Sequence, residues 1–471
     1  LGHNRSVDDI VRAAIQEDAD GIAISSYQGG HMEYFRYMVD RLRELGAEQI
    51  RVFGGGGGTI TPDEISELMD YGIERIYHPN DGMELGLDAM IKDLIDRTTA
   101  ARVRTRAPAR AESAVDIAAM ISAIEEGVFE STELERLRKE WREQAGEVPV
   151  IGITGTGGAG KSSVTDEILN RFLASFDEMR IAVLAVDPTR RRTGGALLGD
   201  RIRMNTLRSE RIYMRSIATR RQHLATSEML GDHILFLKSR GFDLVIVETA
   251  GIGQSDSEIV DMVDFSVYVM TSDYGAASQL EKIDMLDFAD LVVLNKYDKR
   301  GAEDALRDIR KQWKRNHVAF DVADDDVPVY PTIASQFNDP GISWMFAELC
   351  RRVAEKVGLV ADKWTPSIDT SIREPRATAM IPGARIRYLA EIAEQGRAIN
   401  DSADRQAESA SLAQHAYEAL RMLEDSQLPA EFEQYAATAL QADDDRSLLV
   451  LRPVSYTHLT LPTITEWWGG G

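Results

Sequence analysis

A glycine-rich stretch near the middle of the chain carries the clearest chemistry. Residues 155–162, GTGGAGKS, fit the pattern G-x-x-x-x-G-K-[ST] and lie between the apolar run VIGI and the helix-forming run SVTDEILNRFL. In such a loop backbone N–H groups surround phosphates, Lys161 reaches the terminal phosphates and Ser162 can hold magnesium. The alternative is a glycine loop that only turns the chain. The predicted nucleotide-binding residues here are Gly155, Gly157, Gly158, Gly160, Lys161, Ser162 and Ser163.

Two later apolar runs end in residues that would complete this site. GFDLVIVETAG ends in Glu248, a carboxylate expected near the metal, and Gly251, whose N–H is expected at the terminal phosphate. LVVLNKYDKRG supplies Asn295, Lys296 and Asp298, the N-K-x-D pattern, whose aspartate accepts the two adjacent N–H donors that guanine has and adenine lacks. A strand end with a solvated Asn and Asp is the alternative. We therefore predict GTP as the nucleotide. The predicted catalytic residues are Lys161, Glu248 and Gly251.

The stretch AVDPTRRRTGGALLGDRIRM, between these motifs, holds two separated acids. Asp187 ends a predicted strand and Asp200 follows a glycine-rich loop, so both could complete a magnesium shell, although either could instead cap a helix. With the other three motifs in order, this stretch closely resembles the G-protein chaperones of cobalamin-dependent acyl-CoA mutases. In that family D-P-[ST]-…-T-G-G-x-[IL]-L-G-D-[RK]-x-R-M is a hallmark, and the resemblance covers about residues 148–360.

The resemblance implies an activity and a set of roles. In that family slow GTP hydrolysis gates the delivery of adenosylcobalamin to a mutase. It implies that residues 271–286 form a mobile switch segment, and that intrinsic turnover is low, because no glutamine directly follows Gly251 and Gln254 comes only three residues later. The implied magnesium ligands are Ser162, Asp187, Asp200 and Glu248.

The order of apolar runs and breaks predicts the domain organisation. Strands alternate with helices on both sides of an arginine-rich break, which indicates two doubly wound α/β domains with parallel sheets. The first is predicted to be Rossmann- or flavodoxin-like, and the second to be a phosphate-loop GTPase domain. In the second domain strands are expected at 180–187, 243–248, 264–271, 290–295 and 327–332. The predicted parts are a cobalamin-binding domain at 1–97, a linker with a helix over 113–145 at 98–147, the GTPase domain at 148–375, a helical linker at 376–452 with an amphipathic stretch at 385–424, and a non-native tail at 453–471.

The motifs of the first domain are weak when taken alone, and the GTPase domain that follows in the sequence strengthens their assignment. The runs SSYQGGH and VFGGGGGT resemble the cobalamin-binding domains of fused isobutyryl-CoA mutases, whose fingerprint is D-x-H-x-x-G, then S-x-L, then G-G. Ser25-Ser26-Tyr27 fits S-x-L except that tyrosine replaces leucine, and either Gly54-Gly55 or Gly55-Gly56 supplies the glycine pair. The resemblance implies adenosylcobalamin as cofactor, a mutase barrel that binds acyl-CoA, and a homo-oligomeric full-length protein. The implied cobalamin-binding residues are Ser25, Tyr27, Gly54 and Gly55.

The histidines near the start do not match the cobalt ligand. Only one helix, at about 6–18, and one strand, at 20–24, fit between His3 and Ser25, so we expect His3 to end the second strand of the domain and the D-x-H-x-x-G loop to lie before Leu1. His31 could line the cofactor site, but a cap or loop role is favoured. No strand-helix repetition follows residue 375, so the barrel is expected outside this chain.

Composition narrows the partners. There are 54 Lys and Arg against 77 Asp and Glu, a net charge of −23, which argues against binding to nucleic-acid phosphates. The single cysteine, Cys350, allows no internal disulfide, and no apolar run reaches roughly 18 residues, so we expect a cytoplasmic protein with no membrane partner.

Two other function classes compete with this interpretation. One is a stand-alone GTP-dependent regulator with a receiver-like, protein-binding first domain. The other is a nickel-delivery GTPase or another metal- or cofactor-delivery GTPase. A nickel-delivery protein would be expected to have a histidine- or cysteine-rich tract, and the 8 histidines and one cysteine of this chain are not clustered.

Overall fold

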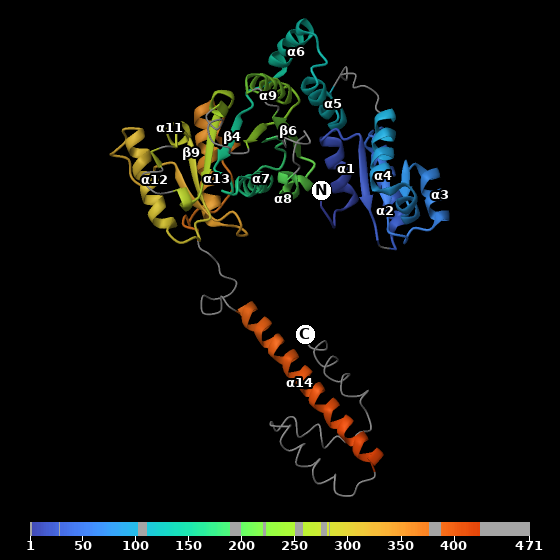
Figure 1. The fold of residues 1–471 in the computed structure, drawn as a ribbon. Helices are drawn as coiled ribbons and strands as arrows, with labels where there is room; N and C mark the ends of the chain where they lie inside the picture. The colour runs from blue at the N-terminus through green and yellow to red at the C-terminus, as the bar shows by residue number, and fades with distance from the viewer. Residues whose placement is uncertain are drawn as a thin grey trace. The chain divides into compact units, whose positions relative to one another are not determined.

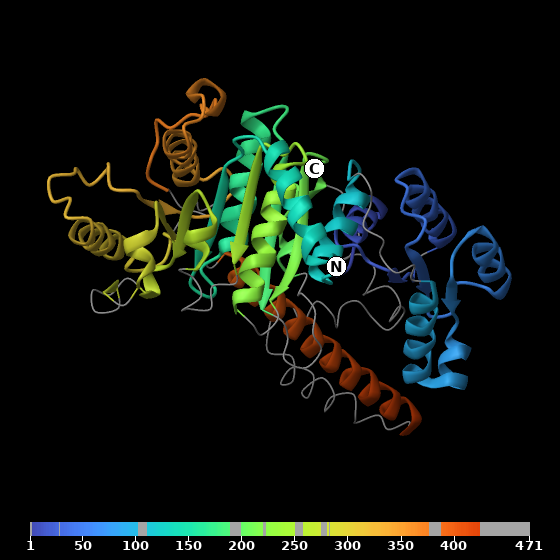
Figure 2. The same ribbon diagram turned by 90° about the horizontal axis from the view of Figure 1, so that it is seen from above.

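The computed structural model describes most of the chain and divides it into two compact units, Leu1–Ala377 and Thr378–Gly471. The described residues are 2–27, 29–101, 111–188, 199–219, 223–249, 258–274, 280–281, 283–375 and 388–423. Figures 1 and 2 show the ribbon from two directions.

The first part of unit 1 is a three-stranded parallel sheet with helices, as predicted. Its strands are β1 (Gly21–Ser25), β2 (Arg51–Gly55) and β3 (Arg75–Tyr77), in that spatial order. Its helices are α1 (Val7–Gln16), α2 (His31–Glu44), α3 (Pro62–Tyr71) and α4 (Pro79–Ala101), the last with a kink at Gly86. Side-chain caps at Ser6 and Thr61 begin α1 and α3, because each hydroxyl accepts a backbone N–H of the first turn.

The second part of unit 1 is a seven-stranded sheet in the order β10-β9-β8-β4-β7-β5-β6, with every described pair parallel. The strands are β4 (Val150–Gly155), β5 (Ile181–Pro188), β6 (Ile212–Thr219), β7 (Leu244–Thr249), β8 (Phe265–Met270), β9 (Leu291–Asn295) and β10 (Val329–Thr332). The α/β prediction is confirmed, and so are its five strands. The sequence did not reveal β6, because the buried Arg215 and Ser216 interrupt its apolar pattern.

Helices surround this sheet, with short 3₁₀ turns between them. The helices are α5 (Ala114–Glu125), α6 (Ser131–Gln144), α7 (Lys161–Ser175), α8 (Gly199–Arg203), α9 (His223–Lys238), α11 (Met285–Phe288), α12 (Ala302–Asn316) and α13 (Pro340–Val357). The turns are η1 (Thr206–Arg208), η2 (Glu258–Met262), η3 (Ser272–Tyr274) and η4 (Ala361–Trp364). The helical stretch expected over 113–145 consists of two helices, α5 and α6, because Gly127 takes a φ of +66° between them.

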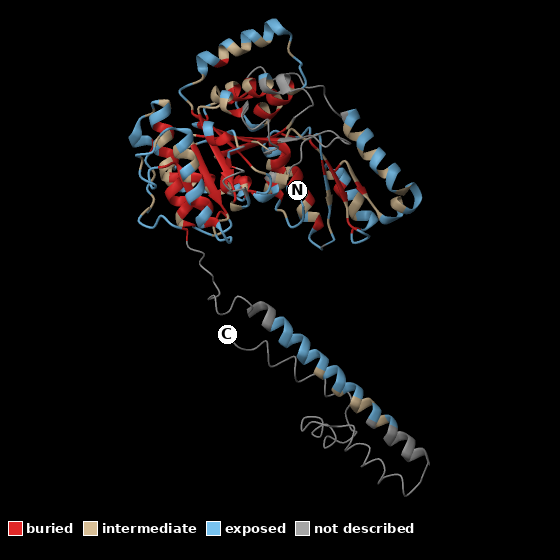
Figure 3. Cartoon of the chain, turned by 60° about the vertical axis from the view of Figure 1, so that its left-hand side comes forward, coloured by how far each residue is buried: buried red, intermediate tan, exposed pale blue. Residues whose placement is uncertain are grey.

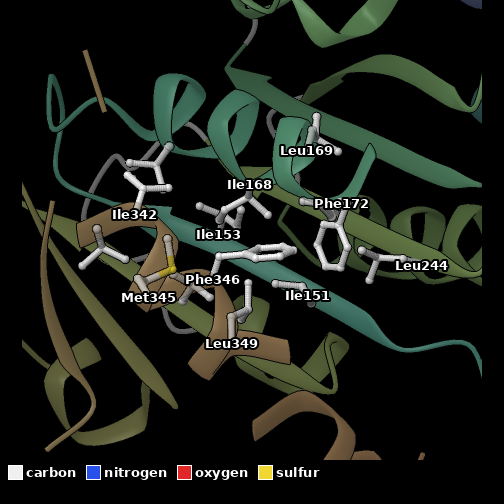
Figure 4. Packing of buried hydrophobic residues seen from close by; sticks show 14 of the residues in the cluster. Ile151, Ile153, Ile168, Leu169, Phe172, Leu244, Ile342, Met345, Phe346 and Leu349 are labelled. Atoms are coloured by element: carbon white, nitrogen blue, oxygen red, sulfur yellow. The ribbon is translucent and has the colours of Figure 1, made fainter. Parts of the chain in front are cut away.

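A tightly packed core joins α7 and α13 to one face of the seven-stranded sheet (Figure 4). Phe172 of α7 is fully buried and meets the Phe346 ring of α13 edge-on, with ring centroids 4.8 Å apart. The ring of Trp364 in η4 also lies against the Phe172 ring, with ring centroids 5.9 Å apart. This packing fixes α7, and therefore the loop from which α7 starts.

Unit 2 contributes one long helix, α14 (Tyr388–Leu423), where the amphipathic stretch was expected. Its apolar side chains Ile392, Ile399 and Leu412 are about half exposed or more, and most of the helix is drawn as exposed in Figure 3. The predicted tail at 453–471 lies outside the described residues. In the described part of the chain, no helix has the length and apolar character needed to cross a membrane.

Replacing Phe172 with alanine should strongly destabilise unit 1. A large cavity between α7 and α13 would lower the free energy of unfolding by about 3–5 kcal/mol. Denaturant unfolding followed by tryptophan fluorescence measures this, because Trp364 packs on the ring. Phe320→Ala is the matched control: Phe320 is 66% exposed, so a change within about 0.5 kcal/mol is expected. Equal losses for both variants would contradict the packing.

Candidate nucleotide and cofactor sites

The phosphate loop connects β4 to α7 and depends on two glycines. Gly155 ends β4 so close to β8 that a Cβ atom there would lie 1.9 Å from the Val269 carbonyl oxygen. Gly160 precedes α7 with a φ of +90°, in the left-handed region that favours glycine, and a Cβ there would meet Asn295 Nδ2 at 2.6 Å. The free N–H groups at the start of α7 and the positive end of its helix dipole then face the loop.

The two chemically active residues of the loop are buried at the first turn of α7. Lys161 Nζ donates to the backbone oxygens of Gly155 (3.1 Å) and Thr156 (3.3 Å), so the ammonium lies across the loop. Ser162 Oγ donates to Oε1 of Glu248 at 2.8 Å, and Glu248 is 3% exposed. Two residues 86 positions apart in the sequence therefore meet, because β4 and β7 are neighbours in register.

This pair fits a magnesium ion. A serine hydroxyl and a carboxylate oxygen 2.8 Å apart are hard oxygen donors of the kind Mg²⁺ prefers. Asp187 is the second-last residue of β5 and Asp200 lies in α8, but the side chains of both lie outside the described part. Among the side chains that the structure describes, no group of three or more His, Cys, Asp or Glu gathers.

The N-K-x-D residues close the other side of the loop. Asn295, at the end of β9, donates from Nδ2 to Ala159 O at 2.8 Å and is 3% exposed. Lys296 takes a φ of +58° and donates from Nζ to Gly158 O at 2.7 Å. Asp298 is exposed in the turn that follows, where a base could reach its carboxylate. The structure thus brings the end of β9 onto the phosphate loop.

The sequence analysis missed the segment that fixes Asn295 from behind. Asn295 Oδ1 accepts from the Ala334 N–H (3.0 Å) and from Thr332 Oγ1 (3.2 Å) at the end of β10. Asp339 supports this segment, because its Oδ2 accepts from the backbone N–H of Ile333 (3.1 Å) and of Ile342 (2.9 Å). Burial raises the pKa of Asp339, against the opposing effect of these hydrogen bonds. The signal was Asp339 before Pro340, a helix start.

Some predicted residues cannot be placed. Gly251 and Gln254 lie outside the described residues, and so does part of the predicted switch segment 271–286. Within that segment, Asp273 of η3 lies 3.3 Å from the Lys299 ammonium, which holds the pKa of the carboxyl below its ordinary value. Ser163 is exposed on α7 beside the loop.

The predicted cobalamin-binding residues share the carboxyl edge of the small sheet. Ser25 pairs with Gly55 in register, and the Ser26 N–H donates to Gly55 O at 2.8 Å. Gly54 faces inward, where a Cβ would lie 2.7 Å from the Phe35 ring, so packing alone requires a glycine there. Tyr27 is 69% exposed and its ring lies against Gly57, so an apolar ring is available at this edge for a cofactor face.

The structure places two of the histidines of this domain that the sequence singled out, His3 and His31. The strand predicted to end at His3 is not formed in the described residues 2–6, because Gly2 and Asn4 take φ values of +79° and +55°, and His3 lies exposed in a bend. His31 lies at a helix start, as the first residue of α2; it is 5% exposed, with Nε2 3.3 Å from Oε2 of Glu64. Hydrogen bonds from Thr61, and then from His31, hold the pKa of Glu64 below its ordinary value.

With this geometry established, comparison with known proteins assigns the family. Residues 117–409 match the family described as methylmalonyl Co-A mutase-associated GTPase MeaB, which is more than half of the chain. The chain belongs to the MeaB family of GTPases. Residues 1–76 match the B12 binding domain, so the small sheet with its helices is a B12-binding domain. The family also implies guanine nucleotide and Mg²⁺ as ligands of the larger sheet.

Relatives with both parts in one chain are known. A fused isobutyryl-CoA mutase of Geobacillus kaustophilus is 48% identical over 431 residues, covering 87% of this chain and 38% of that protein. A fused isobutyryl-CoA mutase of Cupriavidus metallidurans is 50% identical over 404 residues, covering 84% and 37%. The chain therefore spans less than two fifths of these relatives. A crystal structure of a LAO/AO transport system kinase overlays with a TM-score of 0.38 at 19% identity, covering 68% of this chain and 93% of that one.

Replacing Asn295 with alanine should weaken nucleotide binding and the fold together. The loop would lose its bond at Ala159 O, and the buried Ala334 N–H would lose its acceptor, a cost of about 1–3 kcal/mol. We expect about a tenfold to hundredfold loss of affinity for a fluorescent GDP analogue, with a lower melting temperature. Thr332→Val is the control, because it removes only the weaker bond to Oδ1. Unchanged affinity in Asn295→Ala would rule out the bracing role.

Proposed function

We propose that this chain is the GTP-hydrolysing and cobalamin-binding part of a fused acyl-CoA mutase, in which GTP hydrolysis gates the loading of adenosylcobalamin. The observation that carries the proposal is the meeting of Lys161, Ser162, Glu248 and Asn295 at one sheet edge, in a chain that also contains a B12-binding domain. The similarity to proteins named fused isobutyryl-CoA mutase supports isobutyryl-CoA and n-butyryl-CoA as substrates of the longer protein.

Each residue of the site has a task in attack of water on the γ-phosphate. Lys161 would leave its carbonyl acceptors for phosphate oxygens, which are stronger acceptors, and would stabilise their charge. Ser162, Asp187, Asp200 and Glu248 would hold magnesium, which supplies positive charge at the phosphates. The N–H groups of the loop and of Gly251 would bind and orient the phosphates. Asn295 and Lys296 would keep the loop in shape from β9.

Guanine selection is proposed for Asp298. Asp298 lies two residues after Lys296, in the turn that follows β9, and Lys296 ties this turn to the phosphate loop. The exposed carboxylate of Asp298 can therefore contact the base at a fixed distance from the phosphates. A carboxylate is acceptor-only and matches the two adjacent N–H donors of guanine. Adenine would leave this group unpaired.

The cobalamin is proposed to bind at the carboxyl edge of β1 and β2, against Ser25, Tyr27, Gly54 and Gly55. Parallel α/β sheets bind ligands beyond this edge, and the backbone of Gly55 and the ring of Tyr27 lie there. The same proposal takes the cofactor to be adenosylcobalamin, with a histidine as the ligand of its cobalt. It also takes the full-length protein to be a homo-oligomer.

Replacing Asp298 with asparagine should change base specificity. Asparagine presents a donor as well as an acceptor, so it mismatches guanine but matches xanthine, which has a carbonyl in place of the amino group. We expect hydrolysis of GTP to fall at least a hundredfold in kcat/KM and hydrolysis of XTP to rise. Wild-type protein assayed with ATP is the reference for a mismatched base. Retained GTP preference in the variant would exclude Asp298 as the guanine contact.

The gating role predicts a dependence of cofactor transfer on hydrolysis. In the full-length protein, adenosylcobalamin incorporation, followed by its absorption spectrum, should be faster with GTP than with a non-hydrolysable GTP analogue. Lys161→Ala should remove the difference, because it stops hydrolysis, while the matched Lys356→Ala, an exposed lysine of α13, should keep it. Equal rates with both nucleotides would exclude gating by hydrolysis and leave the GTPase assignment intact.

A further inference from the structure

Strand β6 is an edge of the seven-stranded sheet, yet its outward backbone groups are buried. In a parallel pair alternate residues point their N–H and C=O groups away from the neighbouring strand, here at Ile212, Met214 and Ser216. All three residues are buried. Buried backbone groups need hydrogen-bond partners, and an open edge is also a hazard for association.

The partners come from the end of α1, in the B12-binding domain. Gln16 Nε2 donates to Ile212 O at 3.2 Å, and Gln16 Oε1 accepts from the Met214 N–H at 3.4 Å. The Glu17 carboxylate accepts from the Ser216 N–H at 3.1 Å and from Ser216 Oγ at 2.9 Å. The side chains of Gln16, the last residue of α1, and of Glu17, its C-cap, thus take the place of a further strand along β6.

Arg201 of α8 completes this contact, which we call the α1–β6 seam (Gln16, Glu17, Arg201, Met214 and Ser216). Arg201 is 5% exposed and donates to Glu17 Oε1 at 2.8 Å, to Gln16 Oε1 at 3.0 Å and to Met214 O. The Arg201 side chain of this ion pair is buried, at 4% exposure, and the Glu17 side chain is nearly so, at 11%. Breaking one side of such a pair strands a charge, so the contact resists opening.

Helix α8 depends on anchors outside itself. It has only five residues, too few to be stable alone. Beyond its far end, Asp166 of α7 accepts from Thr206 Oγ1 at 2.6 Å and from the Thr206 N–H at 3.0 Å. Arg201 is the anchor at its near end, directly after Asp200.

We propose that Arg201 is a positioning residue for the magnesium site, and that the B12-binding domain holds it in place through Glu17 and Gln16. The inference rests on the proposed function, since it takes Asp200 as a magnesium ligand. The backbone of Asp200 is fixed by its neighbour, whose guanidinium is fixed by α1. Helix α1 also leads directly into β1, which ends at Ser25. The seam therefore joins the metal site of one domain to the cofactor edge of the other.

The test measures magnesium binding without relying on turnover. Magnesium slows the release of a bound nucleotide, so the release rate of a fluorescent GDP analogue is followed against Mg²⁺ concentration in the full chain. We expect Arg201→Met and Glu17→Gln each to raise the Mg²⁺ concentration for half-maximal slowing by about tenfold, the size expected for loss of a supporting contact around a metal site. Release in EDTA should be unchanged.

Three further variants separate the possible causes. Arg201→Lys keeps the charge at the seam and should recover part of the shift. Arg138→Met removes a partly buried arginine that pairs with Asp232 at 2.7 Å in the same domain, away from α8, and should match wild type. Asp200→Asn tests the proposed ligand directly. Melting temperatures check that each variant is folded. If Arg201→Met does not fold, Glu17→Gln, which keeps the shape of the side chain, tests the positioning role in its place.

The outcomes distinguish the positioning role of Arg201 from the role of Asp200 as a magnesium ligand. A shift for Asp200→Asn with none for Glu17→Gln and Arg201→Met would overturn the positioning role while leaving the magnesium site. No shift for Asp200→Asn would overturn its role as a ligand and the inference with it. Faster release in EDTA for Glu17→Gln, with an unchanged Mg²⁺ midpoint, would show a general loosening of the nucleotide site and would also overturn the inference.

Discussion

The parallel pairing of β4 between β7 and β8 is the constraint on which the nucleotide site depends. Because the three strands run the same way, their carboxyl ends meet at one edge, and the phosphate loop, Glu248 and the end of β8 are delivered together. The pairing also explains Gly155, which has no room for a Cβ against Val269. A residue with a side chain would push β8 away, and with it the whole edge. Sheet register and loop chemistry are therefore one requirement.

Buried polar bonds then convert this edge into a rigid site. Asn295 is held by one bond to the loop and two from the β10 end, so it cannot rotate without leaving a buried group unpaired. The Ser162–Glu248 bond is similarly enclosed. Such contacts add little net stability, but they select one arrangement, because alternatives carry the full cost of desolvation.

Local patterns predicted much of this from the sequence, and their limits are physical. The loop, Glu248 and Asn295 were found because the phosphate and base chemistry fixes residue types at short spacing. Strand β6 was missed because Arg215 and Ser216 are buried for contacts with residues about 90 and 200 positions away, which no local window contains. The prediction that a strand ends at His3 came from counting strands and helices along the chain. Such counting takes no account of the left-handed backbone at Gly2 and Asn4, on either side of His3.

The binding of a triphosphate by a chain with a net charge of −23 is consistent with this architecture. Charges farther apart than about 8 Å are largely screened at physiological salt, so the overall charge has a weak effect on affinity. What the phosphates meet is local: the N–H groups at the start of α7, and the ammonium groups of Lys161 and Lys296 drawn across the loop. The carboxylate of Glu248 adds negative charge at the same place, which would oppose phosphate binding unless a cation lay between them. The site is therefore balanced for a nucleotide that arrives with its metal.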